Sequence, residues 1–434
     1  MLVRICKAIV AVALGLALGL GVASGQAKQP QWKDRAEYDL VMAIEKEANA
    51  EARLKLLEQW TEKYPTTDLT LLRLQTYYQT YQQLGRVPDV LSTARSILEI
   101  VPKDVGVLST VAYFTTMLPK PSPDDLSAAE KAAQSVVGLL DAEFAAGKKP
   151  AEISDADWKK RRTVAEANAH RTLGWVAMQH KNYEVAEKAF VRTLGVNPEQ
   201  GEVSYWLGQM ILYQKKAERQ SDALFHFARA AAYTGTGALS PQGRQQVGAY
   251  LAKAYRTYHG EDAAGLKNLQ ELAQSRAFPP EGFRIKSVHE LEAEKRAALA
   301  QADPALALWV SIRENLVAEG GERYFTDSMK DALVPPESMP AFKGTLVSQD
   351  PAKNPKTLVL AIQNPDTPDV TLKLDTAMTG AAPAGTVLQF RGAPESFAKE
   401  PFMVTFQVEK ENVSGCPAPT PPAKKAPRKA APKK

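Results

Sequence analysis

A short apolar pattern that returns at a fixed interval constrains the fold of this 434-residue chain more than any other feature. The segment LGWVA contains Leu173 and Gly174, and LGQMI contains Leu207 and Gly208, so the two glycines are 34 residues apart. A glycine lets paired helices approach closely, and large neighbouring side chains fill the space between them. The residues predicted to pack these pairs are Leu173, Gly174, Ala186, Phe190, Pro198, Leu207, Gly208, Ala223 and Phe227.

The second half of each unit repeats a spacing of its own. Ala186 and Phe190 lie on a second helical segment that Pro198 closes, and Ala223 and Phe227 recur after a short insertion. This period and these positions resemble the tetratricopeptide repeat (TPR). One helix pair of this kind leaves an apolar face uncovered, so several pairs must stack.

The resemblance implies an α-solenoid of antiparallel helix pairs. It is strongest over residues 165–232, looser over 241–275 and weakest over 34–146. In that last region the helices are predicted from the spacing of apolar residues alone. Whether residues 34–146 are true repeats therefore stays open.

Near residue 340 the helical period changes to alternating, β-rich runs bounded by Pro, Gly, Asn and Asp. Phe402 and Phe406 alternate onto one face, which predicts that both lie in a core. The order of the runs resembles an OB-like fold, so the predicted fold is mainly α, a TPR-like α-solenoid followed by a small β-barrel (OB-like) or sandwich. The five predicted strands lie in AFKGTLVSQDP, KTLVLAIQNP, DVTLKLDTA, GTVLQFRGAP and PFMVTFQVEKENV.

Changes in composition and periodicity divide the chain into five predicted regions. The boundaries follow breaks in the helical and alternating patterns. The regions are a signal peptide at 1–27, degenerate TPR-like helices at 28–150, a TPR solenoid with trailing helices at 151–320, a β-rich OB-like domain at 321–415 and a disordered Pro/Lys-rich tail at 416–434.

The first residues indicate export. Arg4 and Lys7 precede an apolar run at residues 8–22, and small residues near Ala23 or Ala27 fit a cleavage site. The alternative is a retained membrane anchor, but the run is shorter than the about 20 residues that span a bilayer. We therefore expect a signal peptide, a periplasmic or extracellular location and no transmembrane anchor after cleavage.

The C-terminal sequence PAPTPPAKKAPRKAAPKK carries much of the positive charge of a chain whose net charge is +5. With no large apolar residue it is predicted to be disordered. It could contact an anionic envelope polymer through electrostatics that salt screens, or only keep the protein soluble. Cys416 is the single cysteine beyond the leader, so no intrachain disulfide is expected, and its role stays open. The predicted tail contacts are Lys424, Lys425, Arg428 and Lys429.

Known catalytic patterns are missing from the sequence. It has no HExxH, no GxSxG and no phosphate-binding loop, and its five histidines lack paired metal spacing. We expect no enzyme activity, no catalytic residue, no metal and no cofactor. The export signal and the mildly acidic body argue against nucleic acid.

The TPR resemblance implies that the first helix of each pair lines a concave face. Aromatic rings flanked by amides and cations suit an extended peptide, with Arg171 as the partner of a carboxylate. The alternative is that Trp175 and Tyr205 pack on a neighbouring pair and line nothing. The predicted groove residues are Asn168, Arg171, Trp175, Gln179, Tyr205, Gln209, Tyr213, Lys253 and Arg256, with Glu202 and Gln246 beside them.

These features favour a non-enzymatic protein–protein interaction scaffold of the cell envelope, which holds an unknown partner peptide or protein in the concave groove. The alternative is an envelope-anchoring or tethering module. In that case the basic tail binds anionic polymer and the helices are a spacer. The identity of the partner, the oligomeric state and any binding by the β-rich domain stay open.

Overall fold

The computed structural model describes residues 31–415. The predicted signal peptide, Cys416 and the four basic tail residues lie outside this range. Internal contacts divide the chain into two units, the first ending at Lys286 and the second beginning at Ser287. Among the described helices, none is both long enough and apolar enough to cross a membrane.

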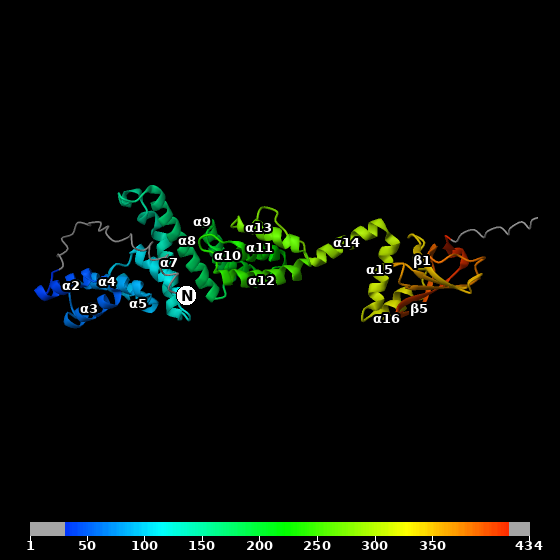
Figure 1. Cartoon of the computed structure of the whole chain (residues 1–434), viewed down its shortest axis with the longest axis horizontal. Helices are drawn as coiled ribbons and strands as arrows, with labels where there is room; N and C mark the ends of the chain where they lie inside the picture. Colours follow the sequence, from blue (N-terminus) through cyan, green and yellow to red (C-terminus); the bar gives the residue numbers. More distant parts are fainter. Residues whose placement is uncertain (1–30, 416–434) are drawn as a thin grey trace, which may run out of the picture. The chain divides into compact units, whose positions relative to one another are not determined.

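The first unit consists of antiparallel helix pairs, in which consecutive helices from α2 to α12 pack on one another and α13 packs on α11 (Figure 1). Short 3-10 turns lie at Ala146–Lys148 and Ala217–Arg219. The pairs are α2 (Arg35–Lys46) with α3 (Ala50–Lys63), α4 (Thr70–Leu84) with α5 (Val87–Ile100), α6 (Val105–Thr115) with α7 (Pro123–Glu143), α8 (Asp155–Gln179) with α9 (Tyr183–Val196), α10 (Gly201–Tyr213) with α11 (Gln220–Ala232), and α12 (Pro241–His259) with α13 (Ala263–Gln274).

Local signals in the sequence explain where these helices begin and end. At α7, the Ser122 hydroxyl accepts a hydrogen bond from the Asp125 amide, and the Asp125 carboxylate accepts one from the Ser122 amide. This capping box satisfies two amides that the first helical turn leaves without partners. Gly85 ends α4 with a φ of 67°, a left-handed conformation that glycine adopts without strain.

Two glycines bring paired helices together. A methyl group on Gly174 of α8 would lie 2.5 Å from the Phe190 ring of α9, so the ring occupies the space of the missing side chain. At Gly208 of α10 the corresponding distance to the Phe227 ring of α11 is 3.2 Å. Both phenylalanines are buried. Each ring thus fills the close approach that the opposing glycine permits.

The early helices stack in the same way as the later ones. Val41, Ile44 and Trp60 form a core within the first pair. A second core joins α5 through α8, from Ala94 to Ala169. The predicted mainly α fold, with an α-solenoid of antiparallel helix pairs, is therefore confirmed for the described residues of the first unit.

The second unit contains α14 (Val288–Ala302), α15 (Pro304–Val317), α16 (Gly321–Tyr324), a π-helical turn at Phe325–Met329, a 3-10 turn at Lys410–Asn412 and one seven-stranded sheet. The sheet order is β5-β6-β3-β2-β1-β4-β7. β3 and β6 are parallel, and the other neighbours are antiparallel. The strands are β1 (Phe342–Asp350), β2 (Thr357–Ala361), β3 (Val370–Leu374), β4 (Val387–Phe390), β5 (Ala393–Lys399), β6 (Phe402–Val408) and β7 (Val413–Ser414).

The prediction of a closed barrel or a two-sheet sandwich is wrong. β5 and β7 form the two edges of a single open sheet and do not pair with each other. The sheet is nevertheless strongly curved, because the rings of Phe390 in β4 and Phe406 in β6 lie 5.5 Å apart although three strands separate them in the sheet order. Strands of alternating polarity can form either a closed barrel or an open sheet. Alternation determines which side chains face the core, but it does not determine whether the two edge strands pair with each other.

One apolar core joins α15 to the sheet. Trp309, Ile312 and Leu316 of the helix are buried in the same cluster as Phe402 and Phe406, which the alternating pattern predicts to be core residues. The Trp309 indole also donates a hydrogen bond to the buried Asp369 carboxylate at 3.0 Å. The structure therefore groups α14 and α15 with the sheet, whereas the sequence places the start of the β-rich domain at residue 321.

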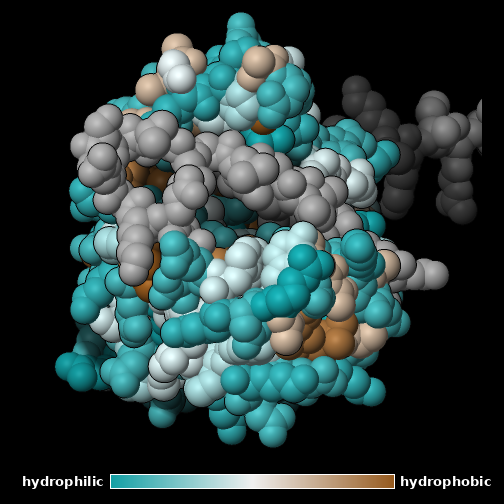
Figure 2. Space-filling view, turned by 90° about the vertical axis from the view of Figure 1, so that its left-hand side faces the viewer, coloured by the Kyte–Doolittle hydropathy of each residue, from teal (hydrophilic) through white to brown (hydrophobic). Residues whose placement is uncertain are grey.

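The face of the molecule at α2 and α3 is mainly polar. Figure 2, which faces the side where α2 and α3 lie, shows a largely hydrophilic surface with scattered apolar side chains. The larger exposed apolar and aromatic side chains of the described residues include Ile100, Val185, Tyr213, Tyr250 and Val317. Two of them, Tyr213 and Tyr250, belong to the candidate site.

Candidate partner-binding hollow

A hollow of about 440 Å³ lies between α10 and α12, the first helices of two successive pairs. Tyr205, Gln209 and Tyr213 of α10 are spaced by four residues, as are Gln246 and Tyr250 of α12, and such spacing places side chains on one helical face. The hollow is lined by Tyr205, Gln209, Leu212, Tyr213, Phe227, Leu239, Gly243, Gln246, Val247 and Tyr250.

Aromatic packing holds the three tyrosines in place. The Tyr205 hydroxyl accepts a hydrogen bond from Gln209 Nε2 at 2.9 Å. The Tyr250 ring lies 5.0 Å from the Phe227 ring, and the Tyr213 ring lies 5.2 Å from the Tyr183 ring. Tyr213 and Tyr250 still expose 48% and 44% of their surface, so both rings can contact a ligand.

The lining of the hollow carries no ionisable acid or base other than tyrosine. Burial, and then the nearby Tyr205 and Tyr213, raise the pKa of Tyr250 above its usual value near 10. The hollow is therefore uncharged at neutral pH. Rings offer contact area at low entropic cost, and the amides of Gln209 and Gln246 can hydrogen-bond a peptide backbone.

Arg171 is already paired within the chain. Its Nη2 lies 2.7 Å from the Glu202 carboxylate, and its Nη1 donates to Thr116 Oγ1 at 3.2 Å. The guanidinium also lies between the rings of Tyr113 and Trp206, at 5.2 and 4.7 Å from their centroids. Only 11% of the Arg171 side chain is exposed. It joins α6, α8 and α10 instead of facing an open groove.

Trp175 also lies in the interior. It is 7% exposed and packs with Ala129 of α7 and with Trp206 of α10. This placement matches the alternative in which the ring packs on a neighbouring pair. Tyr205, in contrast, packs near Phe227 and also lines the hollow.

The other predicted groove residues lie apart from the hollow. Asn168 is half-buried on α8, and Gln179 is exposed at the end of that helix. Lys253 and Arg256 are exposed on α12, where Arg256 pairs with Glu261 at 3.3 Å. The structure thus brings together Tyr205, Gln209 and Tyr213 of the nine predicted residues.

Sequence reasoning did not single out Tyr250 or Leu239. Tyr250 follows Gln246 by four residues, a spacing that could have assigned it to the same face of its helix. Leu239 lies in the connection before α12 and had no such signal. Within residues 31–415, no cluster of three or more His, Cys, Asp or Glu side chains is placed to hold a metal ion.

No protein-family model matches the chain, and no curated protein matches it. Among solved structures, the PilF protein of Pseudomonas aeruginosa is 14% identical, with a TM-score of 0.32 over 55% of this chain and 87% of that one. The MamA protein is 13% identical, with a TM-score of 0.31 over 50% of this chain and 93% of its own.

A tetratricopeptide-repeat protein from Parabacteroides merdae is also 13% identical, with a TM-score of 0.28 over 55% of this chain and 99% of its own. This chain is thus similar to three helical proteins at low identity.

Proposed function

We propose that this chain is a non-enzymatic interaction scaffold of the cell envelope, which holds an extended segment of a partner protein in the hollow between α10 and α12. The observation that carries the proposal is the lining of that hollow, where three tyrosines and two glutamines converge from two first helices without any charged side chain. A volume of about 440 Å³ accommodates a few residues of an extended peptide.

The composition of the hollow indicates the chemistry of its occupant. Tyr213 and Tyr250 provide half-exposed rings, which bind aliphatic, aromatic or proline side chains. Gln209 and Gln246 provide amides for main-chain carbonyl and N–H groups. An uncharged segment therefore fits better than an acidic or basic one, since burying an unpaired charge here is unfavourable.

Of the remaining predicted groove residues, Asn168 and Gln179 lie on α8 and Lys253 and Arg256 lie on α12, and in this proposal they extend the contact surface beyond the hollow. Arg171 and Trp175 support it by fixing α8 against α6, α7 and α10. In this proposal they act on helix placement and do not touch the partner.

Capture from the envelope fraction with cross-linking tests the proposal. The baits are the full chain, a Tyr213→Ser/Tyr250→Ser variant and a matched Tyr38→Ser/Tyr81→Ser control, which changes two tyrosines on the first helices α2 and α4. All four tyrosines retain some exposure, so circular dichroism should show folded helices in every bait. A partner is then identified, purified and titrated against each bait.

We expect the partner to bind the full chain and the control equally, and the hollow variant at least about tenfold more weakly, because aromatic anchors dominate such contacts. Binding should persist at high salt. A fourth bait ends at Gly415. A partner that is lost from this shortened bait, and from the full chain at high salt, but is kept by the hollow variant would contradict the proposal and favour the tether. Cell fractionation tests the envelope location separately.

A further inference from the structure

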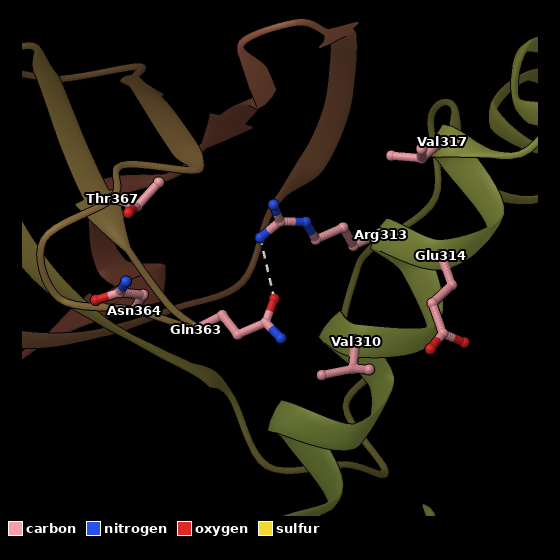
Figure 3. A pocket seen from close by; sticks show the side chains of 7 residues that line it. All are labelled: Val310, Arg313, Glu314, Val317, Gln363, Asn364 and Thr367. Atoms are coloured by element: carbon pink, nitrogen blue, oxygen red, sulfur yellow. Dashed lines mark hydrogen bonds between the residues drawn. The ribbon is translucent and has the colours of Figure 1, made fainter. Parts of the chain in front are cut away.

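The second unit contains a hollow of about 600 Å³ between α15 and the loop that joins β2 to β3. Figure 3 shows Val310, Arg313 and Val317 projecting from the helix toward this loop, which supplies Gln363 and Thr367. The helical residues are three and four positions apart, so they share one face. This hollow is independent of the one between α10 and α12.

Arg313 is a cation without an acidic partner there. Its guanidinium lies 5.0 Å from the centroid of the Phe402 ring, and Nη1 donates to Gln363 Oε1 at 3.0 Å. Among the ion pairs of the described residues, none involves Arg313. A guanidinium has five N–H donors, and the hydrogen bond to Gln363 uses one of them.

Gln363 adds further donors. Because arginine only donates, Gln363 must turn its carbonyl oxygen toward Arg313, which leaves its NH₂ group for a ligand. Thr367 contributes a hydroxyl on the same side. These groups are mainly hydrogen-bond donors, and they surround one cation. Such an arrangement suits a carboxylate, which is an anion with two acceptor oxygens.

The acidic neighbour of Arg313 pairs with a second arginine. Glu314 also lines the hollow, and its carboxylate lies 3.4 Å from Arg296 Nη2 of α14 in an exposed ion pair that offsets part of its charge. In Figure 3 the Glu314 carboxylate points away from Gln363. It therefore repels an incoming anion only weakly.

We propose that this hollow binds a carboxylate attached to an aliphatic group. The carboxylate accepts hydrogen bonds from Arg313 and Gln363, and the aliphatic group lies between Val310 and Val317, of which Val317 leaves 51% of its surface exposed. Two sources share this chemistry, the free C-terminus of a peptide that ends in an aliphatic residue and a small branched-chain acid.

Calorimetric titration of the purified full chain tests the site with three probes. They are N-acetyl-Ala-Ala-Ala-Val with a free C-terminus, the same peptide as its C-terminal amide, and 3-methylbutanoate. We expect the acid peptide to bind at least about tenfold more tightly than the amide, because only the acid pairs with Arg313. The uncharged α10–α12 hollow gives no such preference for acid over amide.

Comparison of the acid peptide with 3-methylbutanoate distinguishes the sources. Equal affinities identify a small acid as sufficient, and tighter binding of the peptide identifies a chain terminus. Either result supports the site. Equal binding of acid and amide, or no binding of either acid probe, overturns it.

Two variants from different elements localise the binding. Arg313→Gln removes the cation, and Gln363→Glu places a competing carboxylate beside it, so each should weaken acid binding at least about tenfold. Arg323→Gln changes an exposed arginine of α16 that pairs with Asp327, and it should bind as the wild type does. Undiminished binding by either hollow variant overturns the assignment. Thermal unfolding of each variant shows that the fold is kept.

Discussion

Each unit of this chain contains a buried tryptophan whose indole donates to a buried carboxylate, but the two hydrogen bonds join different kinds of structure. In the first unit, Trp60 of α3 donates to Glu37 of α2 at 2.9 Å, within a single helix pair. In the second unit, Trp309 of α15 donates to Asp369 at 3.0 Å and so connects a helix to a sheet 60 residues away in sequence.

The two hydrogen bonds indicate that stability is distributed differently in the two units. In a stack of helix pairs each pair contacts only its neighbours, so losing one contact loosens the structure locally. In the second unit α15 and the strands share one core, so the same kind of loss destabilises the whole unit. The two buried carboxylates are therefore expected to respond differently to the same substitution.

The largest expected effect comes from Asp369→Ala. Asp369 accepts hydrogen bonds from Trp309 Nε1, from the Ile362 amide at 2.8 Å and from the Gln363 amide at 3.4 Å. Removing this acceptor leaves buried donors without partners, so the free energy of unfolding of the second unit should fall by about 3–5 kcal/mol. Urea titration checks this, with exposed Asp366→Ala as the control. A change below about 1 kcal/mol would refute a shared core.

Glu37→Ala removes the corresponding carboxylate from the first unit. The Glu37 carboxylate also accepts from Thr67 Oγ1 at 2.7 Å and from the Lys33 amide at 2.7 Å. Its loss should reduce local stability by about 2–3 kcal/mol. Hydrogen exchange should increase in α2 and α3 and stay unchanged in α10 to α13, whereas exposed Asp39→Ala should change neither. Faster exchange throughout the unit would contradict a local response.

The free energy of unfolding of the first unit, which contains His226, should depend on pH. Burial, and then the charges of Arg229 and Arg219, lower the pKa of His226 to about 3, against about 6.5 in an unfolded chain. Between these values the unfolded state binds a proton that the folded state does not. The first unit should therefore lose about 2 kcal/mol between pH 7 and pH 5. His226→Phe should remove this part of the slope in denaturant titrations, and an unchanged slope would count against it.

The smallest expected changes in stability come from Gly→Ala substitutions within the helices. Gly174→Ala introduces a methyl group 2.5 Å from the Phe190 ring and should destabilise the first unit by about 1–2 kcal/mol. Gly208→Ala, at 3.2 Å from Phe227, should cost less. Gly138→Ala has no neighbour within 4 Å and should stabilise by about 0.5–1 kcal/mol. Thermal unfolding ranks the three, and a different order would show that glycine does not set the helix spacing.

The sequence predicts the helix pairs well, because apolar spacing and terminal residues such as Gly85 act locally. It also predicts the strands β1 to β4 and β6. It does not predict β5, where Pro394, Glu395 and Lys399 interrupt the alternation, or the two-residue β7. Closure of the sheet depends on which edges pair, and alternation contains no such information.

The residues of the candidate site are also predicted only in part from the sequence. The TPR resemblance, which implies that the first helix of each pair lines a concave face, predicts Tyr205, Gln209 and Tyr213 together with six residues that do not line the hollow. The pairing of Arg171 with Glu202 on the helix two further along the chain depends on how the helices align, as does the burial of Trp175 against α7. Contacts between helices that are distant in sequence are set by packing, which no local pattern encodes.

The most direct test of the binding hollow is a site-specific photo-cross-link in living cells. Benzoylphenylalanine replaces Gln246, which lines the hollow, or Lys188, which is exposed on the second helix α9. A partner should cross-link from position 246 and not from 188, and the Tyr213→Ser/Tyr250→Ser changes should abolish the product. Equal cross-linking from both positions, or a product that survives those changes, would contradict the account.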